Sequence, residues 1–298
     1  MQLGTLIPQN DIGGTPAALR EFAQTAEGLG YDFLEAADHV LGVNVASRPD
    51  WQKDRNTSAD WFHDPFVMFG FLAGVTKLGF STGVLILAQR QAVLVAKQAA
   101  SLDVLCDGRF RLGVGVGWNE VEFVGLNENF RNRGRRSEEQ VQVMQKLWAD
   151  PHVEFIGKWH RIEDARINPR PPSGRVPVWF GGHHELTLQR IAQYGDGWMM
   201  LAYPMGQQAV AEFDRLRRMV EAAGRDPHGI GLEVWVSTGA GGPQQWREEF
   251  RFWQRAGVTH VTVASTHGRG VHARIAGRTM QDHIAAITQY REAVADLL

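Results

Sequence analysis

The sequence predicts an α/β protein folded as a (β/α)8 TIM barrel, and two observations lead to this fold class. Eight short runs rich in β-branched and aromatic residues alternate with longer stretches whose apolar residues recur at helical spacing, which is typical of parallel βα units. The chain has 298 residues, and eight such units in about 250 residues are enough to close a barrel. A doubly wound sheet rarely needs eight units, so the barrel is the favoured architecture.

Each barrel strand is expected where a short apolar run lies between turn or helix signals. The eight predicted strands are Gln2–Ile7, Asp32–Ala36, Gly79–Leu85, Arg109–Val116, Val176–Gly181, Gly197–Leu201, Leu232–Ser237 and Thr259–Ala264. Helices are expected at 16–29, 92–106, 137–148, 186–194, 207–223, 243–256 and 279–297. Thr15 and Pro16 are typical of a helix start, and Gly30 is typical of a helix end. Ser137 and Gln140 have the spacing of a capping box, which predicts a helix beginning at Ser137.

Two connections are too long for simple turns, and both follow barrel strands. Residues 41–63 come after the second strand, and residues 150–175 come after the fourth. The second of these holds a predicted β excursion that ends in a proline-rich turn. Insertions after barrel strands lie on the face where active sites form, so both are expected near the site. No repeat or linker divides the chain, and a single domain over residues 1–298 is predicted.

The composition excludes several classes of protein. A net charge of −2 gives no basic surface for nucleic acid, and one cysteine, Cys106, allows neither a disulfide framework nor a cysteine metal cage. The first ten residues lack the basic and apolar regions of a signal peptide, and no uncharged run approaches the roughly 20 residues of a membrane span. The expectation is a cytoplasmic protein without membrane or nucleic-acid partners.

Glycine occupies every second position at 113, 115 and 117 in the fourth predicted strand. The dinucleotide-binding pattern G-x-G-x-x-G fails here, because the sixth position is Trp118 counted from Gly113 and Glu120 counted from Gly115. Alternation places the three glycines on one face of the strand. Two explanations remain open: the bare face accommodates a crowded barrel interior, or it lets a flat group lie close to the backbone.

Two further motifs carry residues suited to chemistry. Asp38 and His39 end the second strand, where barrel side chains point toward the active-site mouth, and histidine can transfer a proton near neutral pH. A role in fixing the following loop is the alternative. The run "FGGHHE" at 180–185 precedes a predicted helix, whose N-terminus favours an anion, although a plain turn would also fit. Its adjacent histidines do not project to one side, so no metal site is expected.

Several motifs in the same order resemble the luciferase-like monooxygenase superfamily, and most closely its branch that uses the deazaflavin coenzyme F420. They are "GLGYDFLEAADH" at 28–39, "FSTGVLIL" at 80–87, "LGVGVGWNEVEF" at 112–123, "FRNRGRRSEEQVQVMQKLW" at 130–148 and "PVWFGGHHELTLQRIAQYGDGWM" at 177–199. The resemblance extends over nearly the whole chain and implies a single luciferase-like TIM-barrel domain.

The resemblance also implies roles for individual residues. Asp38 would hydrogen-bond the polar edge of the deazaflavin ring, and His39 would face the substrate as acid or base, which makes both candidate catalytic residues. A non-prolyl cis peptide is implied between Gly83 and Val84, against the ring. The remaining implied cofactor contacts are Gly117, Trp118 and Asn119 at the ring or ribityl chain, and Gly181, Gly182 and His183 at the phosphate, with His184 close behind.

The sequence departs from the family pattern at two places. Sugar-phosphate dehydrogenases of the family carry an acidic residue where this chain has Trp118, and a Trp where it has Val43. These differences argue against a sugar-phosphate substrate. Glu120 and Glu122 follow nearby without an assigned role. The basic run "RNRGRR" at 131–136 is interpreted as a solvated salt-bridged loop rather than a contact to the cofactor's anionic tail.

Three functions are compatible with these observations. The first is an F420-dependent oxidoreductase that transfers a hydride between the coenzyme and a small organic substrate. The second is a two-component flavin monooxygenase that receives reduced FMN from a partner reductase. The third is a non-catalytic flavin- or F420-binding protein. The resemblance further implies a homodimer that pairs through helices near the second and third strands.

Overall fold

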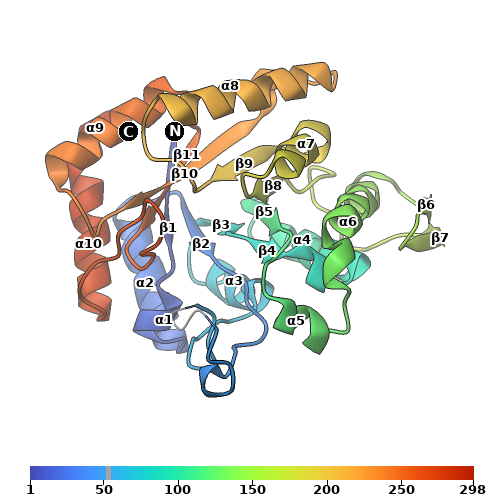
Figure 1. Ribbon diagram of the computed structural model, residues 1–298, viewed down its shortest axis with the longest axis horizontal. Coiled ribbons are helices and arrows are strands. Elements are labelled where there is room, and N and C mark those ends of the chain that lie inside the picture. The colour runs from blue at the N-terminus through green and yellow to red at the C-terminus, as the bar shows by residue number, and fades with distance from the viewer. Residues whose placement is uncertain (52–54) are drawn as a thin grey trace.

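The computed structural model describes residues 1–51 and 55–298, and its central element is a closed parallel barrel (Figure 1). The barrel strands are β1 (Gln2–Leu6), β2 (Phe33–Ala36), β3 (Gly79–Thr82), β5 (Phe110–Gly115), β8 (Val178–Gly181), β9 (Gly197–Met200), β10 (Gly231–Ser237) and β11 (His260–Ala264). Neighbouring strands pair in parallel around the barrel, and pairing of β3 with β5 closes the ring. The predicted TIM barrel is therefore confirmed.

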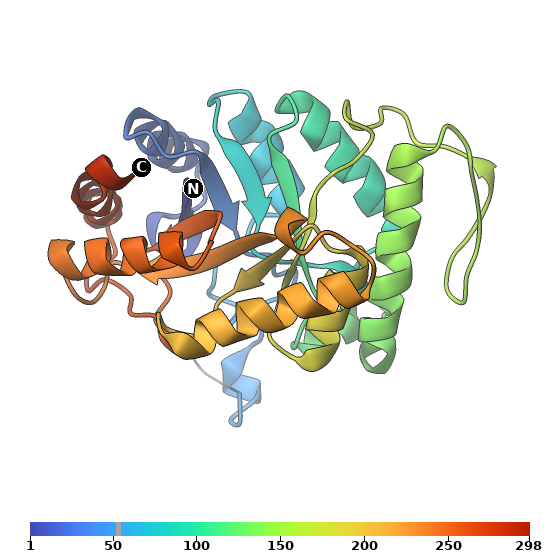
Figure 2. The ribbon, with the colours of Figure 1, turned by 90° about the horizontal axis from the view of Figure 1, so that it is seen from above.

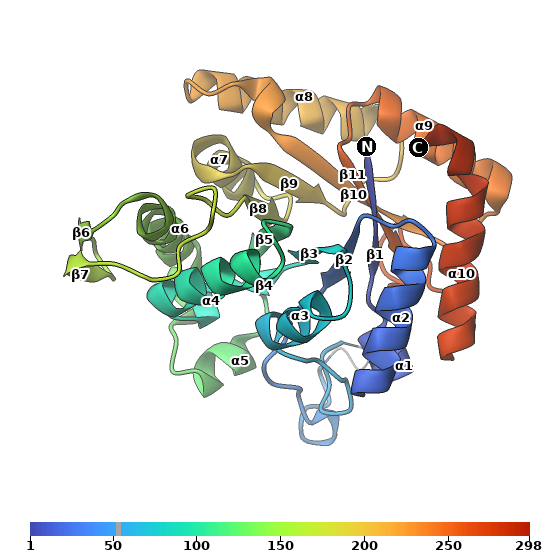
Figure 3. The ribbon, with the colours of Figure 1, turned by 180° about the vertical axis from the view of Figure 1, so that it is seen from behind.

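Helices surround the barrel on its outer side, as Figures 1 and 3 show. The longer ones are α2 (Pro16–Gly28), α3 (Pro65–Ala73), α4 (Ala92–Leu105), α6 (Arg133–Ala149), α7 (Glu185–Tyr194), α8 (Gln207–Ala222), α9 (Pro243–Arg255) and α10 (Met280–Ala293); α1 (Gln9–Ile12) and α5 (Glu120–Gly125) are short. The sequence analysis did not predict α3. Its residues "PFVMFGFLA" are apolar on every side, so they give no amphipathic pattern to detect.

The third predicted strand is interrupted in the structure. β3 ends at Thr82, and a separate strand β4 (Leu85–Ile86) continues after Gly83 and Val84. The peptide bond between Gly83 and Val84 is cis, as the family resemblance implied. β4 pairs with the C-terminal half of β5, so this interruption lies at the end of the barrel where the strands terminate.

Both predicted insertions leave the barrel. β6 (Val153–Ile156) and β7 (Arg161–Ala165) form the expected β excursion, an antiparallel hairpin that projects away from the barrel in Figures 1 and 2. In the other insertion, Val43 pairs with Thr57 in an isolated bridge, and the Trp61 amide donates to Asn10 Oδ1 at 2.6 Å. Residues 52–54 of this insertion lie outside the described residues.

Aromatic and charged side chains fill the N-terminal half of the barrel interior. The Arg111 guanidinium lies 4.6 Å from the ring centre of Phe33 and 4.4 Å from that of Trp179. A Cβ atom at Gly4 would overlap the Phe33 ring, and one at Gly231 would overlap the Trp179 ring. Glycines on other barrel strands, Gly4 on β1 and Gly231 on β10, therefore make room for these large rings.

The prediction of a helix beginning at Ser137 is wrong. α6 begins at Arg133, and the Ser137 hydroxyl donates to the Arg133 carbonyl at 2.7 Å instead of capping the helix. The interpretation of the basic run as a solvated loop is also incorrect for two of its arginines. Arg133 donates to the Gly117 carbonyl at 3.1 Å, and the buried Arg136 donates to the Ala88 carbonyl at 2.9 Å and pairs with Glu128. Residues 133–136 of the basic run therefore form the first turn of α6, upstream of the predicted start.

Among the described residues, no helix is long and apolar enough to cross a membrane.

Candidate functional site

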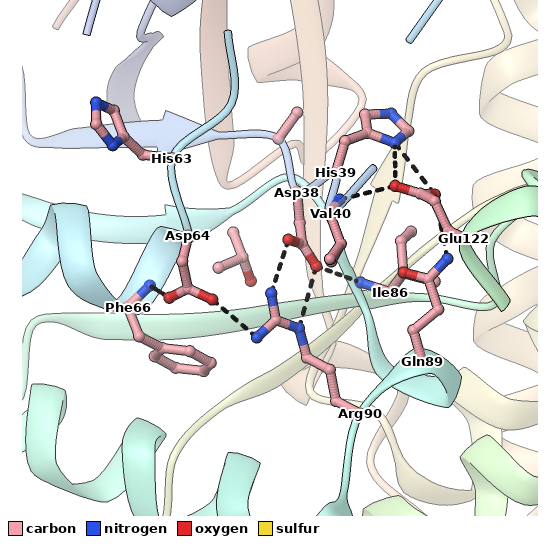
Figure 4. A network of polar contacts seen from close by, with 12 residues as sticks. Asp38, His39, Val40, His63, Asp64, Phe66, Ile86, Gln89, Arg90 and Glu122 are labelled. Atoms are coloured by element: carbon pink, nitrogen blue, oxygen red, sulfur yellow. Dashed lines mark hydrogen bonds and ion pairs between the residues drawn. The ribbon is translucent and has the colours of Figure 1, made fainter. Parts of the chain in front are cut away.

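Asp38 follows the second strand and its carboxylate is fully engaged by the protein (Figure 4). It is 2% exposed, accepts hydrogen bonds from Arg90 at 2.8 and 3.3 Å, and accepts one from the Ile86 amide at 3.1 Å. Arg90 also pairs with Asp64, the N-cap of α3, at 2.9 Å. The sequence analysis expected Asp38 to bond the ring edge, but both of its oxygens already have partners in this structure, and they join the end of β2 to β4.

His39 points the other way, toward α5, where a buried carboxylate meets it (Figure 4). Its Nδ1 lies 3.2 and 3.4 Å from the two oxygens of Glu122. Glu122 also accepts from the Val40 amide at 2.7 Å and from Gln89 Nε2 at 3.1 Å. A carboxylate can only accept, so Nδ1 carries the proton and Nε2 is left as the outward nitrogen.

The electrostatics of this pair favour the ionised acid. Burial acts to raise the pKa of the Glu122 carboxyl, but the hydrogen bonds from His39, Gln89 and Val40 outweigh burial, and its pKa is lowered. In the described part of the chain no hydrogen bond reaches His39 Nε2. The pair therefore presents one imidazole nitrogen in a fixed orientation, which is the arrangement of a general acid or base.

Aromatic rings flank the imidazole. The ring centre of Phe62 lies 4.8 Å from that of His39, and the ring centre of Trp118 lies 6.0 Å from it, both edge-on. The ring centre of Trp51 lies 5.5 Å from that of Trp118, and the Arg55 guanidinium lies 3.7 Å from a Trp118 ring centre. The surroundings of His39 are thus mainly apolar and planar.

Val84 lies between two glycine-containing strands at the end of the barrel. A Cβ atom at Gly115 would come within 2.5 Å of a Val84 methyl, and one at Gly181 would come within 2.7 Å of the other. Gly113, deeper in β5, faces the Thr82 carbonyl and Met199. The crowding explanation therefore holds for these glycines, since a larger residue would displace Val84 or its neighbours. Gly117 has a φ of 77°, which requires glycine for a different reason.

The predicted phosphate residues lie at the end of β8, which includes Gly181, and in the turn before α7. Gly182 has a φ of 116°, and its carbonyl accepts from Trp198 Nε1 at 2.7 Å. His184 caps α7 by accepting from the Leu186 amide at 3.2 Å, whereas His183 is exposed. A small cavity adjoins Gly181 and reaches the N-terminal halves of α6 and α7. Its lining is Val114, Gly115, Val116, Ser137, Phe180, Gly181, Thr187 and Arg190.

Two buried polar atoms beside Glu122 have no hydrogen-bond partner among the described residues. Asn119 caps α5 through Oδ1, which accepts from the Val121 amide at 3.0 Å, but its Nδ2 is unpartnered. Gln89 donates to Glu122, but its Oε1 is unpartnered. A buried donor and a buried acceptor that lack partners are costly unless a ligand or water completes them.

Sequence reasoning did not assign several residues of this site. Glu122 was noted without a role, and Gln89 and Phe62 were not singled out. One signal pointed toward Glu122, its position on the first turn of a helix directly after the glycine strand. The histidine and acidic residues that the structure describes form no group able to hold a metal ion.

The sequence also matches a known protein family. Residues 1–294 match the family model described as luciferase-like monooxygenase. The chain is 31% identical over 214 residues to the pyrimidine monooxygenase RutA of Allorhizobium ampelinum, and the match covers 65% of this chain and 55% of that enzyme.

Two further similarities concern proteins described as F420-dependent. The chain is 27% identical over 260 residues to the F420-dependent glucose-6-phosphate dehydrogenase of Mycolicibacterium fortuitum, covering 82% of this chain and 71% of that enzyme. Its fold matches a solved F420-dependent secondary alcohol dehydrogenase, in complex with an F420-acetone adduct, with a TM-score of 0.78 and 18% identity over 100% of this chain and 99% of that one.

Proposed function

Because the chain belongs to the luciferase-like monooxygenase family, we propose that it is an oxidoreductase that uses coenzyme F420. The coenzyme would exchange a hydride with a small organic substrate when bound. The observation that carries this proposal is the His39–Glu122 pair, which fixes an imidazole nitrogen after the end of β2. At the same end of the barrel, Val84 lies against Gly115 of β5 and Gly181 of β8. The likenesses to two F420-dependent dehydrogenases support the choice of coenzyme.

The residues present fit a flat cofactor with a phosphate group. The unpartnered Asn119 Nδ2 and Gln89 Oε1 supply one donor and one acceptor, which suits the amide and carbonyl groups of a pyrimidine-like ring edge. The cavity beside Gly181 is lined by Ser137, Thr187 and Arg190, whose two hydroxyls and guanidinium suit an anion at the N-terminus of α7. Its volume is about 10 Å³, so these side chains would have to move apart to admit a whole phosphate group. We propose that Asn119 and Gln89 bind the ring edge, and that Ser137, Thr187 and Arg190 bind the phosphate.

In this proposal His39 donates or accepts the proton that accompanies hydride transfer. Nε2 would donate to, or accept from, the substrate's oxygen or nitrogen, and Glu122 stabilises the imidazolium that forms when Nε2 takes a proton. Asp38 acts differently, because Arg90 and the Ile86 amide already occupy its carboxylate. We propose that Asp38 positions β4 rather than bonding the cofactor.

The aromatic side chains beside His39 indicate the kind of substrate. The rings of Phe62 and Trp118 form T-shaped pairs with the imidazole, and Trp118 stands where the family's sugar-phosphate dehydrogenases carry an acid. We therefore propose a compact apolar substrate with one oxidisable or reducible polar group, rather than a sugar phosphate.

A titration tests the cofactor and separates the alternatives. We expect tight, saturable binding of F420, and turnover with members of a panel of alcohols, imines and enones. Tight FMN binding without F420 affinity would contradict the proposal. It would favour a two-component flavin monooxygenase supplied by a reductase, which the likeness to the pyrimidine monooxygenase supports. Stoichiometric F420 binding with no turnover across the panel would indicate a binding protein instead.

We also propose that two copies of the chain pair through α3 and α4. These helices expose the apolar side chains Val67, Val93, Leu94 and Leu105, and Val67 is 70% exposed. Exposed apolar residues on two contacting helices favour a protein partner. Light scattering should give a dimer mass, and Val67→Asp should shift it toward the monomer. A monomeric wild-type protein at micromolar concentration would contradict the dimer.

A further inference from the structure

Two carboxyl groups meet inside the barrel, below the candidate site. Glu35 on β2 and Glu233 on β10 are both 0% exposed, and one hydroxyl, that of Thr262, lies within reach of both carboxyl groups, 3.5 Å from Glu35 Oε2. Trp235 Nε1 donates to Glu35 Oε1 at 2.8 Å, and the Thr262 hydroxyl donates to Glu233 Oε1 at 2.5 Å. Two ionised carboxylates this close together in an interior without water would repel each other strongly, so one of the pair carries a proton.

The surrounding charges identify which carboxyl is neutral. Arg111 Nη1 lies 2.7 Å from Glu233 Oε2, so Glu233 has a cation beside it. His260 adds no positive charge, because burial and Arg111 lower its pKa to about 3. Burial and the neighbouring Glu233 raise the pKa of Glu35 well above its usual value, with Arg111 opposing them. One arginine therefore balances one carboxylate, and the proton belongs to Glu35.

The neutral carboxyl lies directly against the segment that ends the third barrel strand. A Cβ atom at position 83 would overlap the Glu35 carboxyl group, so only glycine fits there. The Gly83 amide donates to the Ala36 carbonyl at 2.8 Å, and Asp38 accepts from the Ile86 amide. Three residues at the end of β2, namely Glu35, Ala36 and Asp38, thus contact the segment from Gly83 to Ile86. Of these three, Glu35 contacts it from inside the barrel.

We propose that Glu35 is a positioning residue that is protonated at neutral pH, donates its hydrogen bond to Glu233, and in this neutral form supports the Gly83–Val84 segment. Its link to cofactor binding rests on the function proposed above, but the protonation and the support do not. An ionised Glu35 would face the Glu233 carboxylate without a proton between them. Repulsion would then push the carboxyl toward Gly83, because Trp235 and Thr262 limit its other movements.

Glu35→Gln and Glu35→Ala together test the proposal, because glutamine preserves the donor and acceptor of a protonated glutamate whereas alanine removes both. In hydrogen exchange followed by mass spectrometry, we expect the amides of residues 80–90 to exchange at the wild-type rate in Glu35→Gln. The same amides should exchange about tenfold faster in Glu35→Ala, since the lost support opens this segment. In an infrared difference spectrum against Glu35→Gln at neutral pH, the wild type should show a protonated carboxyl band.

Glu249→Gln is the matched control. Burial also raises the pKa of Glu249, but this residue lies on α9 and bonds Trp253 Nε1 at 3.3 Å, away from the site. It should lose a carboxyl signal without changing exchange at residues 80–90. Loss of a carboxylate band rather than an acid band in Glu35→Gln would overturn the proposal. So would equal exchange of residues 80–90 in Glu35→Gln and Glu35→Ala. A wild type that binds neither F420 nor FMN would refute the proposed function alone, because both measurements are made without cofactor.

Discussion

His39 and Asp38 are adjacent in sequence, yet their side chains contact different parts of the molecule. Successive residues at the end of a strand point to opposite sides, so Asp38 meets Arg90 beside β4 while His39 meets Glu122 on α5. The sequence analysis identified both as site residues but gave Asp38 a direct role at the cofactor. The carboxylate could not be placed from sequence alone, because Arg90 lies 52 residues away.

We expect His39→Gln to lower kcat by about 10²- to 10⁴-fold, because a positioned general acid or base contributes a factor of that size. Cofactor affinity should change little, since His39 bonds Glu122 rather than the predicted phosphate or ring-edge groups. Glu122→Gln should reduce kcat less and alter its pH profile, because the imidazolium loses its counter-charge. Steady-state kinetics and cofactor titration measure these effects.

Glu120→Gln is the control for Glu122→Gln, because Glu120 is exposed on the same helix. It should behave as wild type. A normal kcat in His39→Gln would show that the imidazole only fixes the loop after β2.

Phe62→Ala should reduce kcat/KM for an aryl alcohol or ketone by about tenfold, since burying an aromatic side chain against a substrate contributes roughly 1–2 kcal/mol. Its neighbour Trp61, which is 50% exposed, provides the control variant Trp61→Ala. Equal losses in both variants would show that the 41–63 insertion acts as a whole. A higher kcat/KM for sugar phosphates than for apolar alcohols in the wild type would contradict the proposed substrate class.

At the scale of elements, Gly115 of β5 and Gly181 of β8 allow Val84 to occupy the end of the barrel. Gly115→Ala should destabilise the protein by about 1–3 kcal/mol, because the new methyl would overlap a Val84 methyl. Val84→Ala removes that methyl, so the double variant should recover most of the loss, as denaturant unfolding would measure. Gly28→Ala, at a helical glycine with nothing within 4 Å, is the control and should not destabilise. Additive effects of the first two substitutions would exclude the overlap.

The N-terminus of α7 and the cavity next to it provide a second prediction at this scale. Arg190 lines the cavity and bonds Glu138 at 2.8 Å. Arg190→Gln should weaken binding of a phosphorylated cofactor by about tenfold, because hydrogen bonds to charged groups contribute roughly 1.5–3 kcal/mol. Binding of the same cofactor without its phosphate should not change. Equal weakening of both ligands would place the phosphate elsewhere.

For the molecule as a whole, two half-buried histidines, His260 and His267, predict instability in acid. Burial lowers the pKa of His260 to about 3 and that of His267 to about 4, so below pH 6.5 the unfolded chain binds protons that the folded chain does not. The free energy of unfolding should therefore fall as pH drops from about 6.5 to about 4. Each of these histidines contributes up to about 1.4 kcal/mol per pH unit. His260→Gln should flatten this slope in melting curves, and an unchanged slope would contradict the assignment.

Much of this architecture could be predicted from local sequence patterns. All eight barrel strands and the hairpin after the fourth were predicted near their observed positions, because each has its own apolar run and turn signals. α3 was missed because a uniformly apolar helix has no period to detect. The start of α6 was misplaced because Ser137 has the spacing of a cap, whereas its hydroxyl bonds the preceding turn of the helix.

Local sequence patterns were enough to predict the barrel, the positions of Asp38 and His39 at a strand end, and glycines on one face of the fourth strand. That Gly115 faces Val84, and that Asp38 and His39 meet Arg90 and Glu122, depends on the folded chain. Glu122 reaches His39 across 83 residues, and Trp235 reaches Glu35 across 200. The physical reason is that barrel closure brings together strands distant in the chain, and the charge and hydrogen-bonding state of an interior carboxyl depends on those neighbours rather than on its own segment.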